Sequence, residues 1–437
     1  MPVVRPEPDD PFRVLILGDF SGSGAGGRQP LRVDRDNFDT VLKGLGLNVE
    51  FALGNGQLGD ADLKFESLED FEPDSIYQRS ELFSHLNGKE QPYDYSHEPE
   101  QVPALRTQQA EDLVRLTSRG GLLDAAIART TALADATDEW QATVDRIAAK
   151  YATPRDSADK VRATAERVQR AGMLMNNILH DARFQALEAA WRGLDLLVCH
   201  LESDTAVQLY IFDISKERLA AGLDETDVFK GSDWSAIAGN YAFDRAVAQD
   251  VLLLKRLAKI AHELDAPFIA ECVPSQKENA KAEILWQELR KSPEAQWLAL
   301  AMPRFLLRLP YGKETSTIAS FEFEEMPGTP KHFDYLWGNP TFACIYLLGR
   351  LFSEQGWDMR PAPNDCIDGI PLHSYKLNGE AHTQPCAEVL LSERDCAALL
   401  KDGLLPLASV KDSDAVRFPR MQSIADPATM LAGKWLN

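Results

Sequence analysis

Three glycines near the N-terminus have the spacing of a phosphate-binding loop. Gly22, Gly24 and Gly27 form a G-x-G-x-x-G pattern after the apolar run 14–17, which is typical of a buried strand. In a dinucleotide-binding fold a helix begins at such a loop, so that its N–H groups face the pyrophosphate. Here helical periodicity begins only near Asn37. We therefore interpret the segment as a flexible strand-to-strand loop, with nucleotide binding as the weaker alternative.

Four side chains of the kinds that bind zinc lie close together near the C-terminus: Cys366, His373, His382 and Cys386. Zinc sites usually contain ligand pairs two to four residues apart, which places both ligands on one turn. The spacings here are six, eight and three residues. An Asn-Gly turn between the two histidines could bring them together, but buried thiols and surface histidines are the interpretation that we favour. We predict neither a metal nor a cofactor.

Glutamates and arginines in one stretch could supply acid–base chemistry or bind an anion. Glu322 and Glu324 would share one face of a strand, and Glu325 is adjacent. Arg304 and Arg308 lie four residues apart in an apolar setting, where arginine forms bidentate pairs with carboxylates. We expect a solvated or partner-binding face for the glutamates, and internal or intersubunit ion pairs for the arginines. The motifs of serine hydrolases, zinc proteases and P-loop nucleotidases do not occur, so we predict that the protein is not an enzyme.

Length and charge narrow the class of protein. A chain of 437 residues predicts two or three domains, and 44% apolar with 26% charged residues indicates a globular protein. The net charge of −21 argues against nucleic-acid or anionic-membrane binding, because phosphate contacts need clustered Lys and Arg. No apolar run approaches the ~18 residues that span a bilayer, and the start lacks the apolar stretch of a secretory signal. We expect a cytoplasmic protein with six reduced cysteines.

Apolar periodicity predicts a small N-terminal unit of β-α-β-β order. A strand at 14–17 is followed by a helix from Asn37 and by a hairpin from the alternating runs 49–53 and 63–65. Ser67 and Asp70 resemble a capping box, with Asp in the usual Glu or Gln position. Almost half of the net charge lies in residues 60–100, which lead into a loop rich in Pro and Tyr. A central helical segment follows, with apolar stripes at 140–151, 161–178 and 184–198.

From about residue 205 the predicted helices and strands alternate, which indicates a larger mixed α/β domain. Strands are expected at 207–211 and 267–273, and helices at 246–264, twice around 278–300, and at 340–355. The turn Asn378-Gly379 predicts a hairpin between residues 372–377 and 388–391. Ser392 is expected to cap a helix that ends at Gly403.

Three N-terminal segments resemble the small sheath subunit of the bacterial type VI secretion system, the TssB/VipA family. They are PFRVLILGDFS at 11–21, VDRDNFD at 33–39 and DLKFESLEDF at 62–71. Their order and spacing match that family over about 11–117. The resemblance implies that residues 1–117 form a small-sheath-subunit-like domain with an acidic linker.

Further segments resemble the large sheath subunit, the TssC/VipB family. They are found at 122–127, 184–194, 237–243, 266–270, 303–312, 335–339, 371–375 and 388–394. The resemblance implies a large-sheath-subunit-like domain over 118–437, helical over 118–200 and α/β over 201–437. The chain thus resembles a fusion of two subunits that are normally separate.

What the resemblance implies is mechanical rather than enzymatic. The family builds a contractile sheath around a tube on a baseplate, neighbouring subunits exchange strands, and a Clp-type AAA+ ATPase disassembles the sheath. That ATPase reads a short helix near the start of the large subunit. The residues that match this helix are Leu122, Leu123, Asp124 and Ile127. A linker helix packed on the body is the alternative for this segment.

Large sheath subunits continue into a C-terminal region that contributes to strand exchange, and residues 423–435 do not resemble it. We therefore expect a sheath-like component that acts on sheath, tube or baseplate proteins in assembly, capping or regulation. Repulsion between copies of charge −21 favours the same interpretation. The alternative is a single-chain protomer that forms a homo-oligomer by polymerising into the sheath. An unrelated enzymatic use of the Gly-rich loop is a distant third hypothesis.

Overall fold

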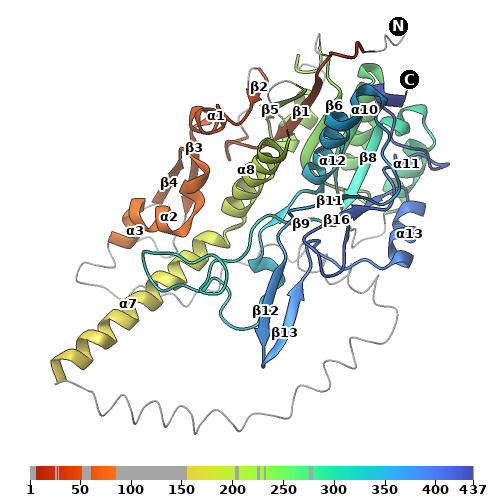
Figure 1. The fold of residues 1–437 in the computed structure, drawn as a ribbon. Coiled ribbons are helices and arrows are strands. Elements are labelled where there is room, and N and C mark those ends of the chain that lie inside the picture. The colour runs from red at the N-terminus through yellow and green to blue at the C-terminus, as the bar shows by residue number, and fades with distance from the viewer. Residues whose placement is uncertain are drawn as a thin grey trace.

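The computed structural model describes residues 6–24, 27, 29–51, 61–84, 155–201, 206–223, 227–230, 233–274 and 279–436. Its centre is a seven-stranded sheet (Figure 1). The strand order is β14 (Leu405–Pro406), β8 (Leu298–Met302), β7 (Phe268–Val273), β6 (Ala236–Asp244), β1 (Phe12–Gly18), β5 (Val207–Asp213) and β2 (Leu31–Val33). All neighbours are parallel except β2, which is antiparallel to β5.

Successive residues of the central strands point into two different cores. On β1, Val14 and Ile16 belong to one buried cluster, whereas Leu15 and Leu17 belong to another. This alternation is the consequence of the two-residue period of a strand, and both faces are apolar because helices cover both. The strand reads as a continuous apolar run in the sequence for the same reason.

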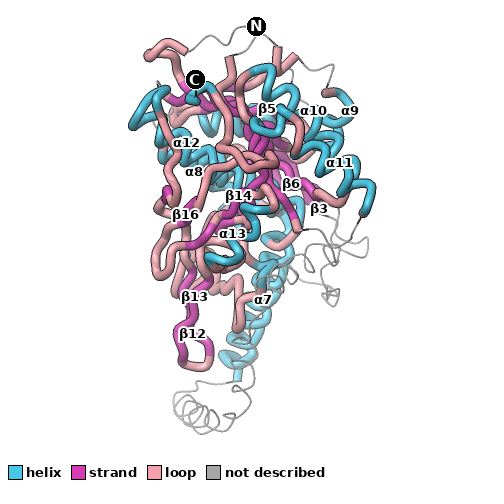
Figure 2. Tube along the Cα trace, turned by 90° about the vertical axis from the view of Figure 1, so that its right-hand side faces the viewer, coloured by secondary structure: helices cyan, strands magenta, loops and turns pink. Residues whose placement is uncertain are grey.

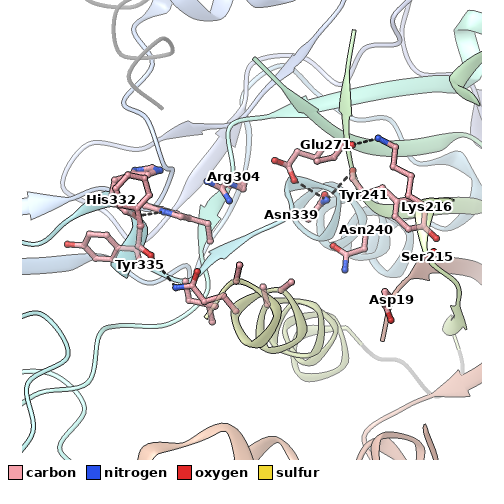
Figure 3. A pocket seen from close by; sticks show the side chains of 18 of the residues that line it. Asp19, Ser215, Lys216, Asn240, Tyr241, Glu271, Arg304, His332, Tyr335 and Asn339 are labelled. Atoms are coloured by element: carbon pink, nitrogen blue, oxygen red, sulfur yellow. Dashed lines mark hydrogen bonds between the residues drawn. The ribbon is translucent and has the colours of Figure 1, made fainter. Parts of the chain in front are cut away.

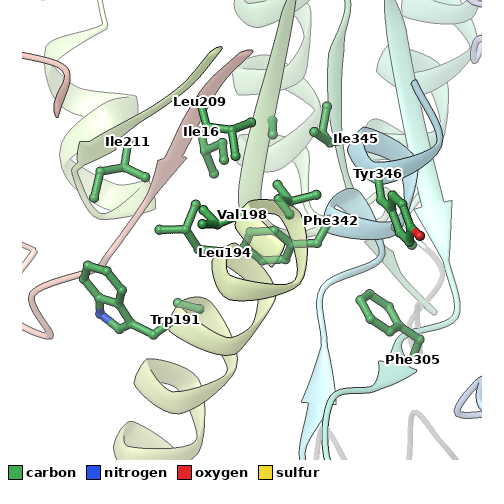
Figure 4. Packing of buried hydrophobic residues seen from close by; sticks show 14 of the residues in the cluster. Ile16, Trp191, Leu194, Val198, Leu209, Ile211, Phe305, Phe342, Ile345 and Tyr346 are labelled. Carbon is green, nitrogen blue, oxygen red and sulfur yellow. The ribbon is translucent and has the colours of Figure 1, made fainter. Parts of the chain in front are cut away.

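Helices form a layer on each face of the sheet. α8 (Ala182–His200) and α12 (Pro340–Gln355) contribute to the first core. Figure 4 shows Trp191, Leu194 and Val198 of α8 packed in the same cluster as the strand residues Ile16, Leu209 and Ile211. The second core receives side chains from α9 (Lys216–Gly222), α10 (Ala248–Leu264), α11 (Ala280–Arg290) and α13 (Glu393–Lys401).

The N-terminal elements after β2 pack beside α8 rather than on the sheet. They are α1 (Phe38–Leu45), the antiparallel pair β3 (Leu47–Phe51) and β4 (Ala61–Phe65), the 3-10 turn Leu68–Phe71, α2 (Pro73–Arg79) and α3 (Glu81–Ser84). Phe65 and Phe71 stack 4.2 Å apart and both contact Phe184. Phe38 contacts Trp191 edge-on at 5.5 Å. α8 is thus the shared wall between this unit and the sheet.

Two elements extend away from the sheet in Figures 1 and 2. One is α7 (Arg155–Leu179), whose last turns are buried, and the other is the hairpin β12 (His373–Leu377) with β13 (Glu380–Gln384). Small sheets complete the body: β9 (Phe305–Leu306) with β10 (Trp337–Gly338), and β16 (Val416–Phe418) between β11 (Asp365–Ile367) and β15 (Ala408–Ser409). Among the described residues, no helix is long and apolar enough to cross a membrane.

The α/β class and most of the predicted elements are confirmed. The opening contains one more strand than predicted, β2, which is only three residues long. The hairpin prediction at 372–391 is wrong in its second strand: Leu377 pairs with Glu380 across the two-residue Asn-Gly turn, so β13 is Glu380–Gln384. Only one α-helix forms at 278–300, because a 3-10 turn at Pro293–Trp297 leads directly into β8.

The apolar stripe at 140–151 lies outside the described residues, and so do residue 60 and residues 85–100 of the acidic stretch. The division at residue 117 also stays a prediction.

Candidate functional site

The Gly-rich loop after β1 is closed by carboxylates of the same chain. The backbone N–H groups of Phe20 and Ser21 donate to Asp213 Oδ1 at 2.7 and 3.0 Å. That of Gly24 donates to Asp19 Oδ1 at 3.0 Å, and Gly24 has a φ of 56° that favours glycine. These N–H groups are the donors that a phosphate would need, and the chain continues into β2 rather than into a helix. The geometry supports the loop interpretation over nucleotide binding.

A buried ion-pair network connects α8 with the segment after β9. Arg308 Nε lies 2.8 Å from Glu188 Oε1, and its terminal nitrogens lie 2.8 and 3.0 Å from the two carboxylate oxygens of Glu325. Arg192, one turn after Glu188, also donates to Glu188 Oε1 at 2.7 Å. Glu188 and Glu325 are almost completely buried. We refer to Glu188, Arg192, Arg308 and Glu325 as the ion-pair core.

The electrostatics of the ion-pair core stabilise its charged form. Burial of Glu325 disfavours its charge, but Arg308 and His180 outweigh that effect and lower the pKa of Glu325 to about 2. The Glu325 carboxylate also accepts the backbone N–H of Tyr311 at 2.7 Å, and the Arg308 guanidinium lies 4.4 Å from the Tyr311 ring centre. The arrangement fixes the loop 308–325 on α8 and leaves no free acid–base pair within the ion-pair core.

Arg304 forms a second pair on a different carboxylate. Its Nε and a terminal nitrogen lie 3.0 and 2.6 Å from the two oxygens of Glu388, and His332 Nε2 lies 2.9 Å from one of them. Arg304 and Arg308 therefore contact different parts of the chain although they are four residues apart. Both arginines are paired internally, and a role for either at a subunit interface stays a prediction.

The N-terminal unit is attached to the loop 308–325 by a backbone clasp. Asp74, in the first turn of α2, accepts the backbone N–H groups of Ala319 at 2.9 Å and Ser320 at 2.7 Å. Burial opposes ionisation of Asp74, but hydrogen bonds from Ser320 and Ala319 outweigh it and hold the pKa of Asp74 below its usual value. Tyr77, one turn later, packs on Phe321 with ring centres 4.9 Å apart. Segments about 240 residues apart in sequence thus meet directly.

Glu322 and Glu324 are exposed, as the favoured interpretation expected, but they do not lie on a strand. Glu324 accepts the N–H of Lys313 at 2.9 Å. Glu325, considered only as their neighbour, is the buried partner of Arg308. The signal that could have identified Glu188 is its position four residues before Arg192 on the apolar face of a predicted helix, where a lone charge would be costly.

The four candidate soft ligands do not converge. His382 lies opposite Tyr375 in the hairpin, and Tyr375 packs between His373 and His382. Cys386 is buried, with its thiol 3.4 Å from the carbonyl oxygen of Ile370. The described part of the chain contains no group of three or more His, Cys, Asp or Glu side chains that could hold a metal ion. All six cysteines are free thiols, and four of them are buried.

The predicted ATPase-binding residues Leu122, Leu123, Asp124 and Ile127 lie outside the described residues, so their role stays a prediction.

Fold and site together define a doubly wound α/β protein whose buried charges join its parts to one another. Two family models match the sequence of this protein. The VipB model, described as EvpB/VC_A0108, tail sheath N-terminal domain, matches residues 166–425, and the VipA model of the type VI secretion system, described as VipA, VC_A0107 or Hcp2, matches residues 7–113. The first match covers more than half of the chain, so the chain belongs to the type VI secretion tail sheath family. The two matches together show a fusion of VipA-like and VipB-like segments.

A curated relative supports this assignment. The chain is 32% identical over 294 residues to the type VI secretion system sheath protein TssC1 of Pseudomonas aeruginosa. The alignment covers 58% of this chain and 59% of that protein. The chain therefore spans less than two thirds of the length of the relative that it matches.

Proposed function

We propose that this chain is a non-enzymatic, sheath-like component of a type VI secretion system. It acts in the bacterial cytoplasm with sheath, tube or baseplate proteins, in the assembly, capping or regulation of the sheath. The main support is the way in which the two matched segments share one sheet. β1 of the VipA-like segment lies between β5 and β6 of the VipB-like segment and is hydrogen-bonded to both. One polypeptide thus completes a unit that resembles two subunits.

The edges of the main sheet favour a limited assembly over a polymer. β2 has only three residues, and the carbonyl oxygen of Arg32 in β2 accepts a hydrogen bond from Asn37 Nδ2 at 3.2 Å. β14 has two residues, and Pro406 lacks a backbone N–H. Short edge strands and proline are common means of preventing strand addition. The net charge of −21 adds repulsion between copies.

The shared sheet also favours a second candidate function. A chain that carries both sheath segments in one folded unit could be a single-chain protomer, which polymerises into the contractile sheath itself. In that case tethering the segments would replace the association of two chains by an intramolecular contact.

Co-sedimentation separates these functions. The purified chain is centrifuged alone and with sheath assembled from separate TssB and TssC proteins of the same bacterium. We expect it to remain in the supernatant alone, and to pellet with the sheath at a level that saturates far below one copy per protomer. Pelleting of the chain alone would support the protomer. Failure to pellet under either condition, matching an unrelated acidic protein, would contradict both functions.

We also propose that the partners include a Clp-type ATPase that reads the segment containing Leu122, Leu123, Asp124 and Ile127. Leu123→Asp or Ile127→Asp places a charge on the apolar side of this motif, so each is expected to weaken ATPase binding by at least about 10-fold. Thr131→Asp, just beyond the motif, is the matched control and should bind like the wild type. Fluorescence anisotropy measures the three affinities. Equal binding by all variants would remove this partner from the proposal.

A further inference from the structure

A cavity of about 440 Å³ lies at the carboxyl ends of the central parallel strands (Figure 3). Asp19 follows β1, Asn240 and Tyr241 lie on β6, and Glu271 lies on β7. In this sheet β5 lies on one side of β1, and the following strand β6 lies on the other. Doubly wound sheets bind their ligands at such a reversal of strand order, outside the carboxyl ends of the strands. The volume is within the range of small-ligand sites.

The cavity has a surplus of negative charge. Three carboxylates line it, those of Asp19, Glu217 and Glu271. The two strong cations in its wall are already paired: Lys216 Nζ lies 2.7 Å from Asp250 Oδ2, and Arg304 is bidentate on Glu388. A ligand therefore meets cations that already hold a carboxylate, and three further acids, of which Glu217 repels Asp19 and Glu271 is attracted by Arg304.

Two of the carboxylates are held in place by the protein. Asp19 accepts the N–H of Gly24, and Glu271, which is nine-tenths buried, accepts a hydrogen bond from Asn339 Nδ2 at 3.2 Å. Burial raises the pKa of Asp19, and the negative charges of Asp213 and Glu217 raise it further. A cation in the cavity would relieve both effects, because it replaces lost solvation and offsets the repulsion.

The far end of the cavity is aromatic. Phe333, Tyr335 and Trp337 line it, and Phe333 is 37% exposed, so the aromatic end is accessible from solvent. Ala182, Ala186 and Ala189 of α8 also form part of the cavity wall, and their small side chains occupy little of the space. Aromatic rings and alanine methyl groups pack against the alkyl stem of an arginine side chain, whose charged head then lies at the carboxylates.

We propose that this cavity binds an organic cation of the guanidinium class. The group is either an arginine side chain of a protein partner or part of a free small molecule. Its N–H groups donate to the carboxylates of Asp19 and Glu271, and its alkyl stem lies along the alanine wall of α8 towards the aromatic end. This binding does not depend on whether the chain takes part in sheath assembly, so it extends beyond the proposed function.

Isothermal titration calorimetry at low salt tests the proposal with two probes. One is agmatine, and the other is the capped tripeptide Ala-Arg-Ala, with the capped Ala-Glu-Ala peptide as a charge control. The variants Asp19→Asn and Glu271→Gln remove one charge each while retaining an oxygen that accepts the N–H of Gly24 or the amide of Asn339. Glu263→Gln, an exposed site on α10, is the matched control. Circular dichroism verifies that each variant is folded.

We expect at least one arginine-like probe to bind, each cavity variant to weaken it about 10-fold or more, and Glu263→Gln to leave it unchanged. Binding of agmatine and the peptide alike indicates that the free cation suffices, whereas binding of the peptide alone indicates a protein source. The proposal is overturned if neither probe binds at millimolar concentration. It is equally overturned if the glutamate peptide binds as well, or if the cavity variants bind like the Glu263→Gln control.

Discussion

Replacement of Arg308 by methionine tests whether the ion-pair core holds the body together. The substitution keeps much of the side-chain volume but removes the hydrogen bonds to Glu188 and Glu325. Both carboxylates are almost fully buried. Glu188 would keep its pair with Arg192, whereas Glu325 would keep only His180 at 3.4 Å and the N–H of Tyr311 in a medium of low dielectric. Breaking a buried pair in this way typically costs about 3–5 kcal/mol. We expect a loss of that size in the free energy of unfolding.

The pKa of Glu325 gives an independent magnitude. A fall in this pKa from 4.5 to about 2 corresponds to about 3 kcal/mol, at about 1.4 kcal/mol for each pH unit. This value agrees with the loss expected from removal of Arg308.

Urea unfolding monitored by circular dichroism measures the effect. Arg162→Met breaks an exposed ion pair with Glu166 on α7 and is the matched control, expected to change stability by less than about 0.5 kcal/mol. Arg308→Lys keeps the charge but loses the planar fork, so its loss should be intermediate. Adding Glu325→Gln to Arg308→Met should restore part of the stability, because it removes an unpaired buried charge. Equal stabilities for Arg308→Met and Arg162→Met would refute the reasoning.

Three further predictions concern the pH dependence of stability, the contact of Asp74 with the loop 308–325, and the packing of α8 against α12. The pKa of Glu325 is lower in the folded than in the unfolded protein, so the stability that its charge contributes is complete above about pH 4.5 and is lost as the pH falls towards 2. The urea midpoint should therefore fall more steeply with acid in the wild type than in Glu325→Gln, and parallel curves would contradict this. Asp74→Ala removes the acceptor for the backbone N–H groups of Ala319 and Ser320, so it should lower the free energy of unfolding in urea by about 1–2 kcal/mol. Asp227→Ala, at an exposed site, should leave it unchanged, and equal losses would show that the contact of Asp74 contributes nothing. Gly193→Ala on α8 places a Cβ 2.5 Å from the Phe342 ring of α12 and should lower the free energy of unfolding by about 1–3 kcal/mol. Gly44→Ala on α1 meets no atom within 4 Å and should raise it by up to about 1 kcal/mol. Thermal unfolding measures both, and a Gly193→Ala variant as stable as the wild type would disprove the close packing.

Local patterns predicted the elements that are decided by local physics. The apolar run of β1, the stripe of α8, the capping box of Ser67 with Asp70, and the helix cap Ser392 all appear where the sequence placed them. β2 was not predicted because three residues carry too little periodicity, and it exists only through its pairing with β5. The wrong second strand of the C-terminal hairpin shows that an Asn-Gly turn fixes its immediate neighbours, not the next apolar run.

The site could be predicted only in part, because its partners are remote in sequence. Arg308 was recognised as a residue that needs a carboxylate, but 120 residues separate it from Glu188. The fold alone brings these groups together. The Gly-rich loop illustrates the same limit. Its spacing matched a nucleotide motif, and only the structure shows that Asp213, 193 residues after Phe20, accepts its N–H groups. The fusion of two sheath segments, by contrast, was recognisable from motif order and is confirmed by the two family matches.

The central claim is that the two sheath-type segments form one closed unit that takes part in sheath assembly without polymerising by itself. Electron microscopy of the purified chain, alone and with the tube protein of the same system, tests it most directly. We predict single particles of uniform size in the absence of other components, and no extended tubules when only the tube protein is added. Long regular tubules formed by this chain, with or without the tube protein, would contradict the claim and establish the chain as a sheath protomer.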